Sequence, residues 1–297
     1  MIVGAPAYLF PPSVGTGGSV PSINIGKIRY QGFDFSIKHL NTIGDFKYNV
    51  GFNLALSGNK VLDYGDESAN LPGLQRKGKA NLVWSLYQAD GLFQSWEEIA
   101  NHPVDQDGMG NSTLAPGDIK YIDTDGNGVL TANDRVYVKN SSMPDLHYGI
   151  TLGAQWKGIY MNAQFQGVAG YNQQINELYT LESRSLQRFQ DYHYYNSWTP
   201  ENPGAEYPRI KFTTSSDNNR LPSTFWVKQC SFLRLKALTV GYRFPSKMLR
   251  RAKISTLDIA LQGGNLFTLS SLHNMDPESL RGYPLSRTYG VTLNFGF

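Results

Sequence analysis

The sequence predicts an all-β fold, an antiparallel transmembrane β-barrel segment with long extracellular loops. Three observations predict it: strand-like segments with alternating apolar residues, connections that alternate between short turns and long loops, and a last strand that ends on an aromatic residue. Aromatic residues make up 13% of the 297 residues and charged residues only 17%, which suits strands and turns better than helices. No segment has the run of about 18 apolar residues that a membrane helix needs, so a spanning structure would have to be a closed barrel.

Strand-like segments recur along the whole chain. In each one, bulky apolar residues tend to occupy every second position, which places them on one face of a strand. The segments are residues 28–40, 46–59, 82–89, 145–156, 159–167, 232–244, 256–266 and 287–297. They predict about eight antiparallel strands, the third of them on the weakest pattern.

The connections between these segments alternate in length. Residues 41–45 and 157–158 form short turns, whereas residues 60–82, 90–144 and 168–231 form long loops. Short turns on one rim and long loops on the other are typical of a transmembrane barrel, whose long loops lie outside the cell. Aromatic residues at strand ends are then expected to form girdles at the two membrane interfaces.

The last strand-like segment, residues 287–297 (RTYGVTLNFGF), closes the chain on its apolar face. That face carries Tyr289, Val291, Leu293, Phe295 and Phe297, while threonine, glycine and asparagine occupy the other face. A soluble sandwich would normally bury such an apolar face. A polar or glycine face opposite a lipid-compatible face is typical of the closing strand of a membrane barrel.

Residues 123–134 (DTDGNGVLTAND) fit the spacing of a calcium-binding loop. The expected ligands are oxygens of Asp123, Asp125, Asn127, Val129 (through its carbonyl), Thr131 and Asp134, with Gly128 at the sharp turn. The flanking residues are predicted to be extended, which argues against a helix-loop-helix sensor. The last ligand is Asp rather than the usual Glu, which shortens its reach. The alternative is a turn held by its own side-chain hydrogen bonds without a metal.

The sequence argues against an enzyme. It contains no Gly-x-Ser-x-Gly elbow, no phosphate loop and no His-Glu-x-x-His pair. Its single cysteine, Cys230, excludes an internal disulfide framework and a multi-cysteine zinc site. A net charge of only +3, with no basic stripe or polybasic run in view, gives no reason to expect nucleic-acid binding.

Aromatic residues are frequent in the long loop formed by residues 168–231. Aromatic faces beside amides and charges suit sugar rings or peptide side chains, so Tyr194, Tyr195 and Trp198 are candidates for contact with a substrate or partner. The alternative is that these side chains simply pack the loop against its neighbours. His193 has no clustered partner in the sequence, so a metal-binding or catalytic role is not expected for it.

Several blocks of the sequence resemble the SusC/RagA-type TonB-dependent outer-membrane transporters, in their carboxyl-terminal part. The blocks are residues 26–37, 89–99, 117–136 (GDIKYIDTDGNGVLTANDRV), 143–170, 196–210, 225–245 (FWVKQCSFLRLKALTVGYRFP), 263–269 (GGNLFTL) and the aromatic terminus. They cover nearly the whole chain in the order found in that family.

The resemblance implies about eight strands of a 22-stranded barrel whose lumen holds a plug. It further implies location in the outer membrane and import of glycans or oligopeptides. The implied partners are a SusD-like surface lipoprotein, the TonB complex and the outer-membrane assembly machinery. In such proteins an aromatic end resembles the signal that this machinery reads, which assigns Tyr289, Val291, Leu293, Phe295 and Phe297 to assembly.

We expect residues 1–297 to be the carboxyl-terminal portion of such a barrel, with the signal peptide, plug and TonB box absent. Residues 1–26 are rich in proline and glycine and resemble a connection that enters a strand. The alternative is a soluble, calcium-stabilised, carbohydrate-binding β-sandwich. It would explain the aromatic residues and the Asp-rich loop, but neither the terminal strand nor the alternation of loop lengths.

Overall fold

The computed structural model describes residues 2–4, 22–24, 26–63, 76–139, 143–175, 190–211, 217–250, 253–280 and 282–297. The chain divides into two compact units. The loop unit consists of Met1–Tyr30, Asn59–Asn140 and Gln173–Lys228, and the barrel-sheet unit of Gln31–Gly58, Ser141–Asn172 and Gln229–Phe297. The connection predicted over residues 1–26 lies largely outside the described residues.

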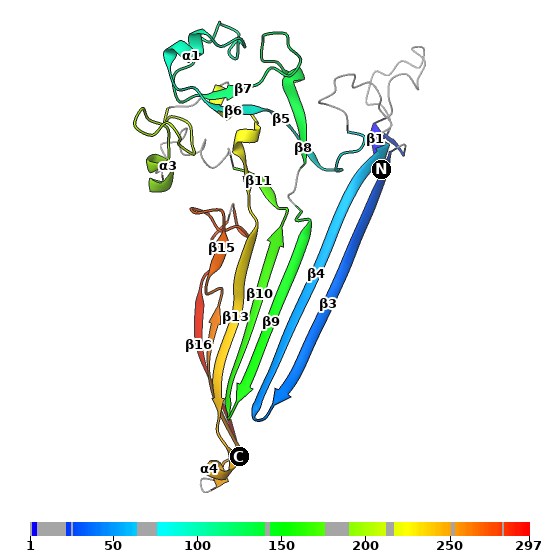
Figure 1. Cartoon of the computed structure of the whole chain (residues 1–297), viewed down its shortest axis with the longest axis vertical. Helices are drawn as coiled ribbons and strands as arrows, with labels where there is room; N and C mark the ends of the chain where they lie inside the picture. Colours follow the sequence, from blue (N-terminus) through cyan, green and yellow to red (C-terminus); the bar gives the residue numbers. More distant parts are fainter. Residues whose placement is uncertain are drawn as a thin grey trace. The chain divides into compact units, whose positions relative to one another are not determined.

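The barrel-sheet unit is built on one antiparallel sheet of long strands (Figure 1). The strand order is β16-β14-β13-β10-β9-β4-β3, and the short strand β15 also pairs with β13. The strands are β3 (Lys27–Ile43), β4 (Phe46–Asp63), β9 (Leu146–Trp156), β10 (Ile159–Ala169), β13 (Phe232–Arg243), β14 (Thr256–Gly264), β15 (Thr268–Ser270) and β16 (Thr288–Gly296). These long strands lie side by side in the order in which they follow one another along the chain, as in a meander, with long connections between β4 and β9 and between β10 and β13.

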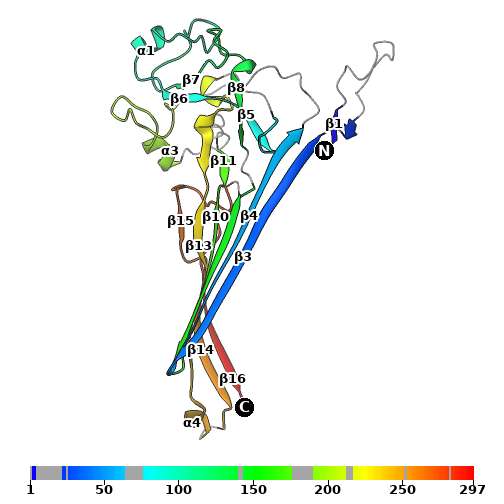
Figure 2. The same cartoon turned by 45° about the vertical axis from the view of Figure 1, so that its right-hand side comes forward.

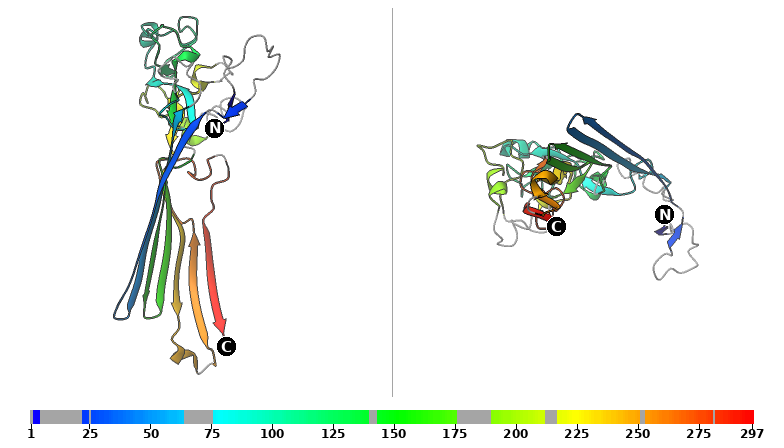
Figure 3. Two further views of the ribbon diagram at one scale, coloured as in Figure 1. Left: turned by 90° about the vertical axis from the view of Figure 1, so that its right-hand side faces the viewer. Right: turned by 90° about the horizontal axis from the view of Figure 1, so that it is seen from below.

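The predicted short turns close the strands at one rim of this sheet (Figures 1 and 2). Trp156 of β9 pairs with Ile159 of β10 across the two-residue turn Lys157 and Gly158. Both turn residues have positive φ, 44° and 90°, as the common two-residue hairpin turn requires. The short helix α4 (Ser246–Leu249) joins β13 to β14 at this rim, near the carboxyl terminus (Figures 1 and 3). We call it the short-turn rim.

The two faces of the sheet differ in chemistry. Apolar side chains of the outer face are exposed: Leu261 is 63% exposed, Val291 74% and Leu293 62%. These residues pair across strands, because Leu261 lies opposite Val291 and Ile259 opposite Leu293. The intervening positions carry polar residues such as Asp258 and Asn294, which also lie opposite one another. The alternation predicted from the sequence is therefore present, and the apolar face has no protein cover within the described residues.

The loop unit consists of short elements. Its strands pair two by two, β5 (Val83–Tyr87) with β8 (Arg135–Lys139) and β6 (Ala89–Leu92) with β7 (Ile119–Tyr121), and β1 (Ile2–Gly4) pairs with β2 (Ser22–Asn24). Its helices are α1 (Trp96–Ala100), α3 (Asp191–Tyr195) and the 3-10 turns η4 (Ala132–Asp134), η5 (Asn218–Arg220) and η6 (Thr224–Trp226). A further strand pair joins β11 (Asn172–Gln174) to β12 (Val227–Gln229).

The loop unit has a core of its own, unlike an ordinary set of surface loops. Phe93, Ile99 and Leu114 pack together, and Tyr121 and Trp226 are at most 1% exposed. The polar centre of this core is Asp118, which is fully buried and binds Arg209 and Lys211 at 2.8 and 3.0 Å. This unit therefore folds around apolar packing and one buried charge cluster.

The predicted strands are confirmed, apart from one that the sequence assigned to the barrel. Residues 82–89 do contain strand β5, but within the described residues β5 pairs with β8, and Tyr87 bridges to Ser223, both in the loop unit. The consecutive residues Leu86 and Tyr87, on opposite faces of β5, are both buried, as in a strand covered on both sides by the loop core. Within the described residues, no helix combines the length and the apolar character needed to cross a membrane.

Candidate functional site

The predicted calcium loop brings three carboxylates together. Oxygens of Asp123, Asp125 and Asp134 all lie within 4.8 Å of one another, although they come from both ends of the loop. The backbone of the loop turns around Asp123, whose two oxygens accept hydrogen bonds from the N–H groups of Gly126 and Gly128 at 2.7 and 2.6 Å. Both glycines have positive φ, 77° and 80°, which allows this tight turn.

The other predicted ligands of the loop make local hydrogen bonds. The side-chain oxygen of Asn127 accepts from the N–H of Val129 at 2.8 Å. Thr131 caps the 3-10 turn η4, and Asp134, at the end of this turn, accepts from the N–H groups of Thr131 and Thr124 at 2.7 and 2.8 Å. The geometry therefore assembles three of the six predicted ligands, while the alternative of a self-bonded turn also describes many of its contacts.

The electrostatics of the three carboxylates follow from these contacts. The hydrogen bond from the backbone N–H of Gly128 is the main reason why the pKa of Asp123 lies below its usual value. For Asp125, lost solvation and the nearby charges of Asp134 and Asp123 raise the pKa above its usual value. A group of anions that repel one another attracts a cation.

The predicted aromatic residues of the long loop separate into two kinds. Tyr194 and Tyr195 on α3 are 61% and 73% exposed, and their rings contact each other edge to face, with centroids 5.2 Å apart. Trp198 instead packs over Gly117, and its indole N–H donates to Oε1 of Gln94 at 3.0 Å. The tyrosine pair is thus available for binding, whereas Trp198 supports the loop.

His193 is nearly fully buried beside the tyrosine pair. Its ring lies 4.7 Å from the ring of Tyr207 between centroids, in an edge-to-face contact. Next to it, Tyr192 donates a hydrogen bond to Glu206 at 2.8 Å, and burial together with this bond raises the pKa of Tyr192 to about 12. These buried aromatic contacts give α3 a fixed inner face and leave Tyr194 and Tyr195 on its outer face.

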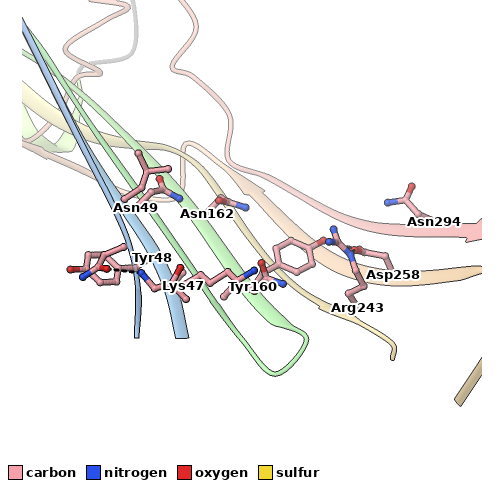
Figure 4. Close-up of a pocket in the computed structure, with 13 residues that line it drawn as sticks. Lys47, Tyr48, Asn49, Tyr160, Asn162, Arg243, Asp258 and Asn294 are labelled. Atoms are coloured by element: carbon pink, nitrogen blue, oxygen red, sulfur yellow. Dashed lines mark hydrogen bonds and ion pairs between the residues drawn. The ribbon is translucent and has the colours of Figure 1, made fainter. Parts of the chain in front are cut away.

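The polar face of the barrel sheet contains a cavity of about 750 Å³ (Figure 4). It is lined mostly by polar residues of seven strands, among them Lys47, Asn49, Asn162, Tyr160, Arg243, Asp258 and Asn294. Tyr160 of β10 reaches over Gly241 of β13 and donates to Asp258 of β14 at 2.7 Å. Arg243 donates to the other oxygen of Asp258 at 3.3 Å.

This cavity was missed by the sequence reading. The alternation indicated which face is polar, but not which polar residues meet. Tyr160 and Asp258 are 98 positions apart in the sequence, and only the strand order β10-β13-β14 brings them together. The one available signal was the glycine at position 241, which leaves room for a large neighbour on the same face.

The predicted assembly residues lie on β16, at the edge of the sheet. Tyr289, Val291, Leu293 and Phe295 are each at least 50% exposed, and Phe297 is 92% exposed. β16 pairs with β14 on one side, and its other edge has no partner strand in the described part of the chain. The rings of Phe295 and Phe297 contact each other edge to face, with centroids 4.8 Å apart.

The chain is similar to known outer-membrane receptors. Two curated relatives from Formosa agariphila, TonB-dependent receptors P26 and P3, are each 28% identical to it over 95% and 92% of the chain. TonB-dependent receptor SusC from Bacteroides thetaiotaomicron is 23% identical over 92% of the chain. No family model matches. The chain spans only 30%, 29% and 27% of the length of these three relatives.

Solved structures of similar fold include the RagAB peptide transporter and the RagAB peptide importer in its open-open state. Both cover 100% of the chain with a TM-score of 0.69, at 21% and 19% identity. The chain spans 32% and 31% of those chains. This likeness confirms the predicted fold.

The chain therefore has the fold of an outer-membrane β-barrel segment and is similar in sequence to TonB-dependent receptors. Within that class, the predicted resemblance to SusC/RagA-type transporters is confirmed, and so is the outer-membrane location. The relatives are named receptors and transporters, which agrees with the prediction that the chain is not an enzyme. The β-sandwich alternative has no counterpart among them.

Proposed function

We propose that this chain forms part of a TonB-dependent importer of glycans or oligopeptides in the outer membrane. The observation that supports this best is the contrast between the two faces of a single sheet. The outer face is an exposed apolar band, and the inner face lines a large polar cavity. A membrane barrel needs this arrangement, because its outer face meets lipid while its lumen is wet.

The proposal includes the position of the chain in a longer protein. We infer that residues 1–297 form the carboxyl-terminal portion of the barrel, since the chain spans about 30% of its relatives. The signal peptide, plug and TonB-interacting segment would then be encoded upstream. Reading the coding sequence before Met1 tests this inference. An upstream stop codon followed by a ribosome-binding site would contradict it.

Uptake experiments test the import function itself. Deleting the gene in its host should abolish growth on either a glycan or an oligopeptide mixture as sole nutrient, and complementation should restore it. Growth on a monosaccharide that porins admit is the matched control and should be unchanged. Unchanged growth on every glycan and peptide tested would contradict the proposed function.

The exposed pair Tyr194 and Tyr195 is the proposed contact for substrate or for a SusD-like lipoprotein. Because paired, exposed rings suit flat apolar faces, replacing both by alanine should weaken binding on the order of tenfold. Met109→Ala, which removes another exposed apolar side chain of the loop unit (63% exposed), is the control. Titration of the purified protein with the imported nutrient and with the lipoprotein distinguishes the two partners. A double variant that binds both normally would rule out this role.

We also propose that Asp123, Asp125 and Asp134 hold a calcium ion, with Asn127, Val129 and Thr131 as further oxygen donors. Calcium prefers several hard oxygen ligands, and three carboxylates within 4.8 Å offer them. Calorimetry on the full chain in detergent should show calcium binding that Asp123→Asn abolishes. Asp45→Asn, the same change in an exposed hairpin turn, should bind normally. If the unaltered protein shows no heat of calcium binding, the metal assignment is wrong.

The terminal residues Tyr289, Val291, Leu293, Phe295 and Phe297 are proposed as the signal for the assembly machinery. Their support is the exposed apolar face of β16 and the 92% exposure of Phe297. Deleting Phe297 from the complete transporter should reduce the amount inserted in the outer membrane. The control is deletion of one other exposed residue, Tyr283, whose exposed fraction is 96%. If the transporter that lacks Phe297 is inserted in normal amounts, Phe297 is not part of the assembly signal.

A further inference from the structure

The connection between β13 and β14 places positive charge at the short-turn rim. Residues 244–255 (FPSKMLRRAKIS) contain no acidic residue, and the side chains of Lys247, Arg250 and Lys253 are exposed. None of these three forms an ion pair within the described part of the chain. The sequence reading, which found no polybasic run, therefore overlooked a local basic cluster.

Two neighbouring contacts define the charge of this rim further. The N–H of Ser255 donates to the carbonyl of Gly296 at 2.9 Å, so the end of β16 lies beside the basic turn. The N–H of Arg243 donates to the carbonyl of Gly158 at 2.8 Å, which brings the hairpin turn with Lys157 alongside. The short-turn rim therefore carries four described cations, Lys157, Lys247, Arg250 and Lys253, against the one acidic residue Asp45 of the β3–β4 turn, so its charge is positive.

A shallow apolar depression of about 360 Å³ lies on the outer face of the sheet next to this basic turn. It is lined by Ile159, Val240, Gly241, Tyr242, Phe244, Ile259 and Leu261. Phe244 precedes Lys247 by three residues, a distance of at most about 11 Å between their Cα atoms. The depression is part of the apolar band, since Ile159 is 50% exposed and Leu261 63%.

This arrangement is complementary to an amphiphile with an anionic head. The cations at the strand ends suit the head, and the apolar depression on the outer face suits the hydrocarbon tail. We propose that the short-turn rim binds an anionic phospholipid. Its acyl chain occupies the depression beside Tyr242 and Phe244, and its phosphate contacts Lys247, Arg250 and Lys253. The depression continues the lipid-facing band, so a lipid reaches it from the bilayer, whereas a water-soluble partner does not.

The aromatic residues at the rim fit this assignment. Trp156, Tyr242 and Phe244 lie at the strand ends, where amphipathic rings sit at the level of lipid headgroups. Nζ of Lys157 lies 5.2 Å from the ring of Trp156, so this cation is also held at that level. Because each basic residue near a membrane surface strengthens attraction to anionic lipid about fivefold, three of them give a marked preference.

Lipid titration of the full chain tests the proposal without any transport assay. The protein in non-ionic detergent is titrated with phosphatidylglycerol and with phosphatidylcholine of the same acyl chains, and bound lipid is counted by native mass spectrometry. We expect phosphatidylglycerol to bind at least tenfold more tightly, and this preference to fade at about 1 M salt. Equal binding of the two lipids would overturn the proposal.

Charge variants locate the headgroup contact. The triple change Lys247→Gln, Arg250→Gln and Lys253→Gln should remove the preference. The control is a triple change of Lys27, Arg29 and Lys60 to Gln, which removes the same number of charges at the other end of β3 and β4. This control variant should keep the preference for phosphatidylglycerol. Circular dichroism checks that both variants retain their strands. A basic-turn variant that folds and still prefers phosphatidylglycerol would contradict the assignment.

Two further arms distinguish a lipid from a free anion. Glycerol 3-phosphate in solution should not displace phosphatidylglycerol, because it lacks the acyl chain that fills the depression. Val240→Phe, which fills the depression and leaves the charge unchanged, should weaken the binding of both lipids. Displacement by glycerol 3-phosphate, or unchanged lipid binding by the Val240 variant, would show that no acyl chain binds there.

Discussion

Gly117 illustrates how much one residue of the loop unit determines. Its φ is +88°, and an added Cβ would lie 2.5 Å from the ring of Trp198 and 2.8 Å from Cβ of Arg209. We predict that Gly117→Ala destabilises the loop unit by about 2–4 kcal/mol, from backbone strain plus overpacking. Gly91 has the same φ of +88° but no neighbour within 4 Å, so Gly91→Ala should cost only about 1–2 kcal/mol. Urea unfolding followed by tryptophan fluorescence measures both; equal losses would contradict the packing argument.

Asp118 makes the stability of the loop unit depend on pH. Burial raises the pKa of its carboxyl, but the bond from Arg209 and the charge of Lys211 outweigh burial, so the pKa lies below the ordinary value of 3.8. A depressed pKa in the folded state means that its stabilisation is complete at neutral pH and is lost as pH falls below 3.8 toward the folded-state value.

We therefore predict that Asp118→Asn destabilises the loop unit by roughly 3 kcal/mol at pH 7, because Arg209 and Lys211 each lose their ion pair with this buried carboxylate, while Lys211 keeps its ion pair with Asp217 at 3.2 Å. The variant should also lose part of the acid dependence expected of the unaltered protein as pH falls below 3.8. Urea unfolding at several pH values measures both effects. If the variant keeps the full acid dependence of stability, that dependence arises from other carboxylates.

Single residues could be predicted from the sequence where the signal is local. The spacing of Asp123, Asp125 and Asp134 within twelve residues was enough to expect their convergence, which the structure shows. The exposed Tyr194 and the packed Trp198 could not be distinguished from the sequence, because both are aromatic residues in one loop. The deciding fact, the open space over Gly117, involves a residue far away in the sequence.

Among the strands, β13 depends on close approach to its neighbour. Gly241 pairs with Tyr160, whose ring occupies the space that a Cβ at position 241 would need. We predict that Gly241→Ala displaces the ring, weakens its bond to Asp258 and destabilises the barrel sheet by about 1–3 kcal/mol. Gly290 on β16 has nothing within 4 Å, so Gly290→Ala should be close to neutral. Thermal unfolding in detergent compares the two, and equal effects would exclude the ring contact as the cause.

The existence and bounds of the strands were largely predictable, whereas membership of a sheet was not. The alternating pattern predicted β9, β10, β13, β14 and β16 to within a few residues at each end. The same pattern in residues 82–89 also predicted a strand, yet β5 packs in the loop unit. Alternation of apolar and polar residues shows that one face of a strand is apolar. It does not show whether that face contacts lipid or a protein core.

The two units of the chain place their apolar side chains in different surroundings. The loop unit buries its large side chains, such as Trp226 and Tyr207 at 0% and 1% exposure. The barrel-sheet unit instead exposes apolar side chains along its strands, among them Phe33, Ile37, Val291 and Leu293. Such a surface is stable only against an apolar medium, because apolar area in contact with water is unfavourable.

This difference predicts separate responses to detergent. In plain buffer the barrel-sheet unit should aggregate, since its lipid-facing surface is exposed and the outer edges of β3 and β16 have no partner strand in the part of the chain that the structure describes. In non-ionic detergent above its critical concentration, the full chain should become dispersed and recover strand content by circular dichroism. The protein should thus elute as one species from size-exclusion chromatography only with detergent present. A monodisperse, folded protein in plain buffer would contradict the membrane-barrel assignment, because the exposed residues of β16 would then need a cover within the chain itself.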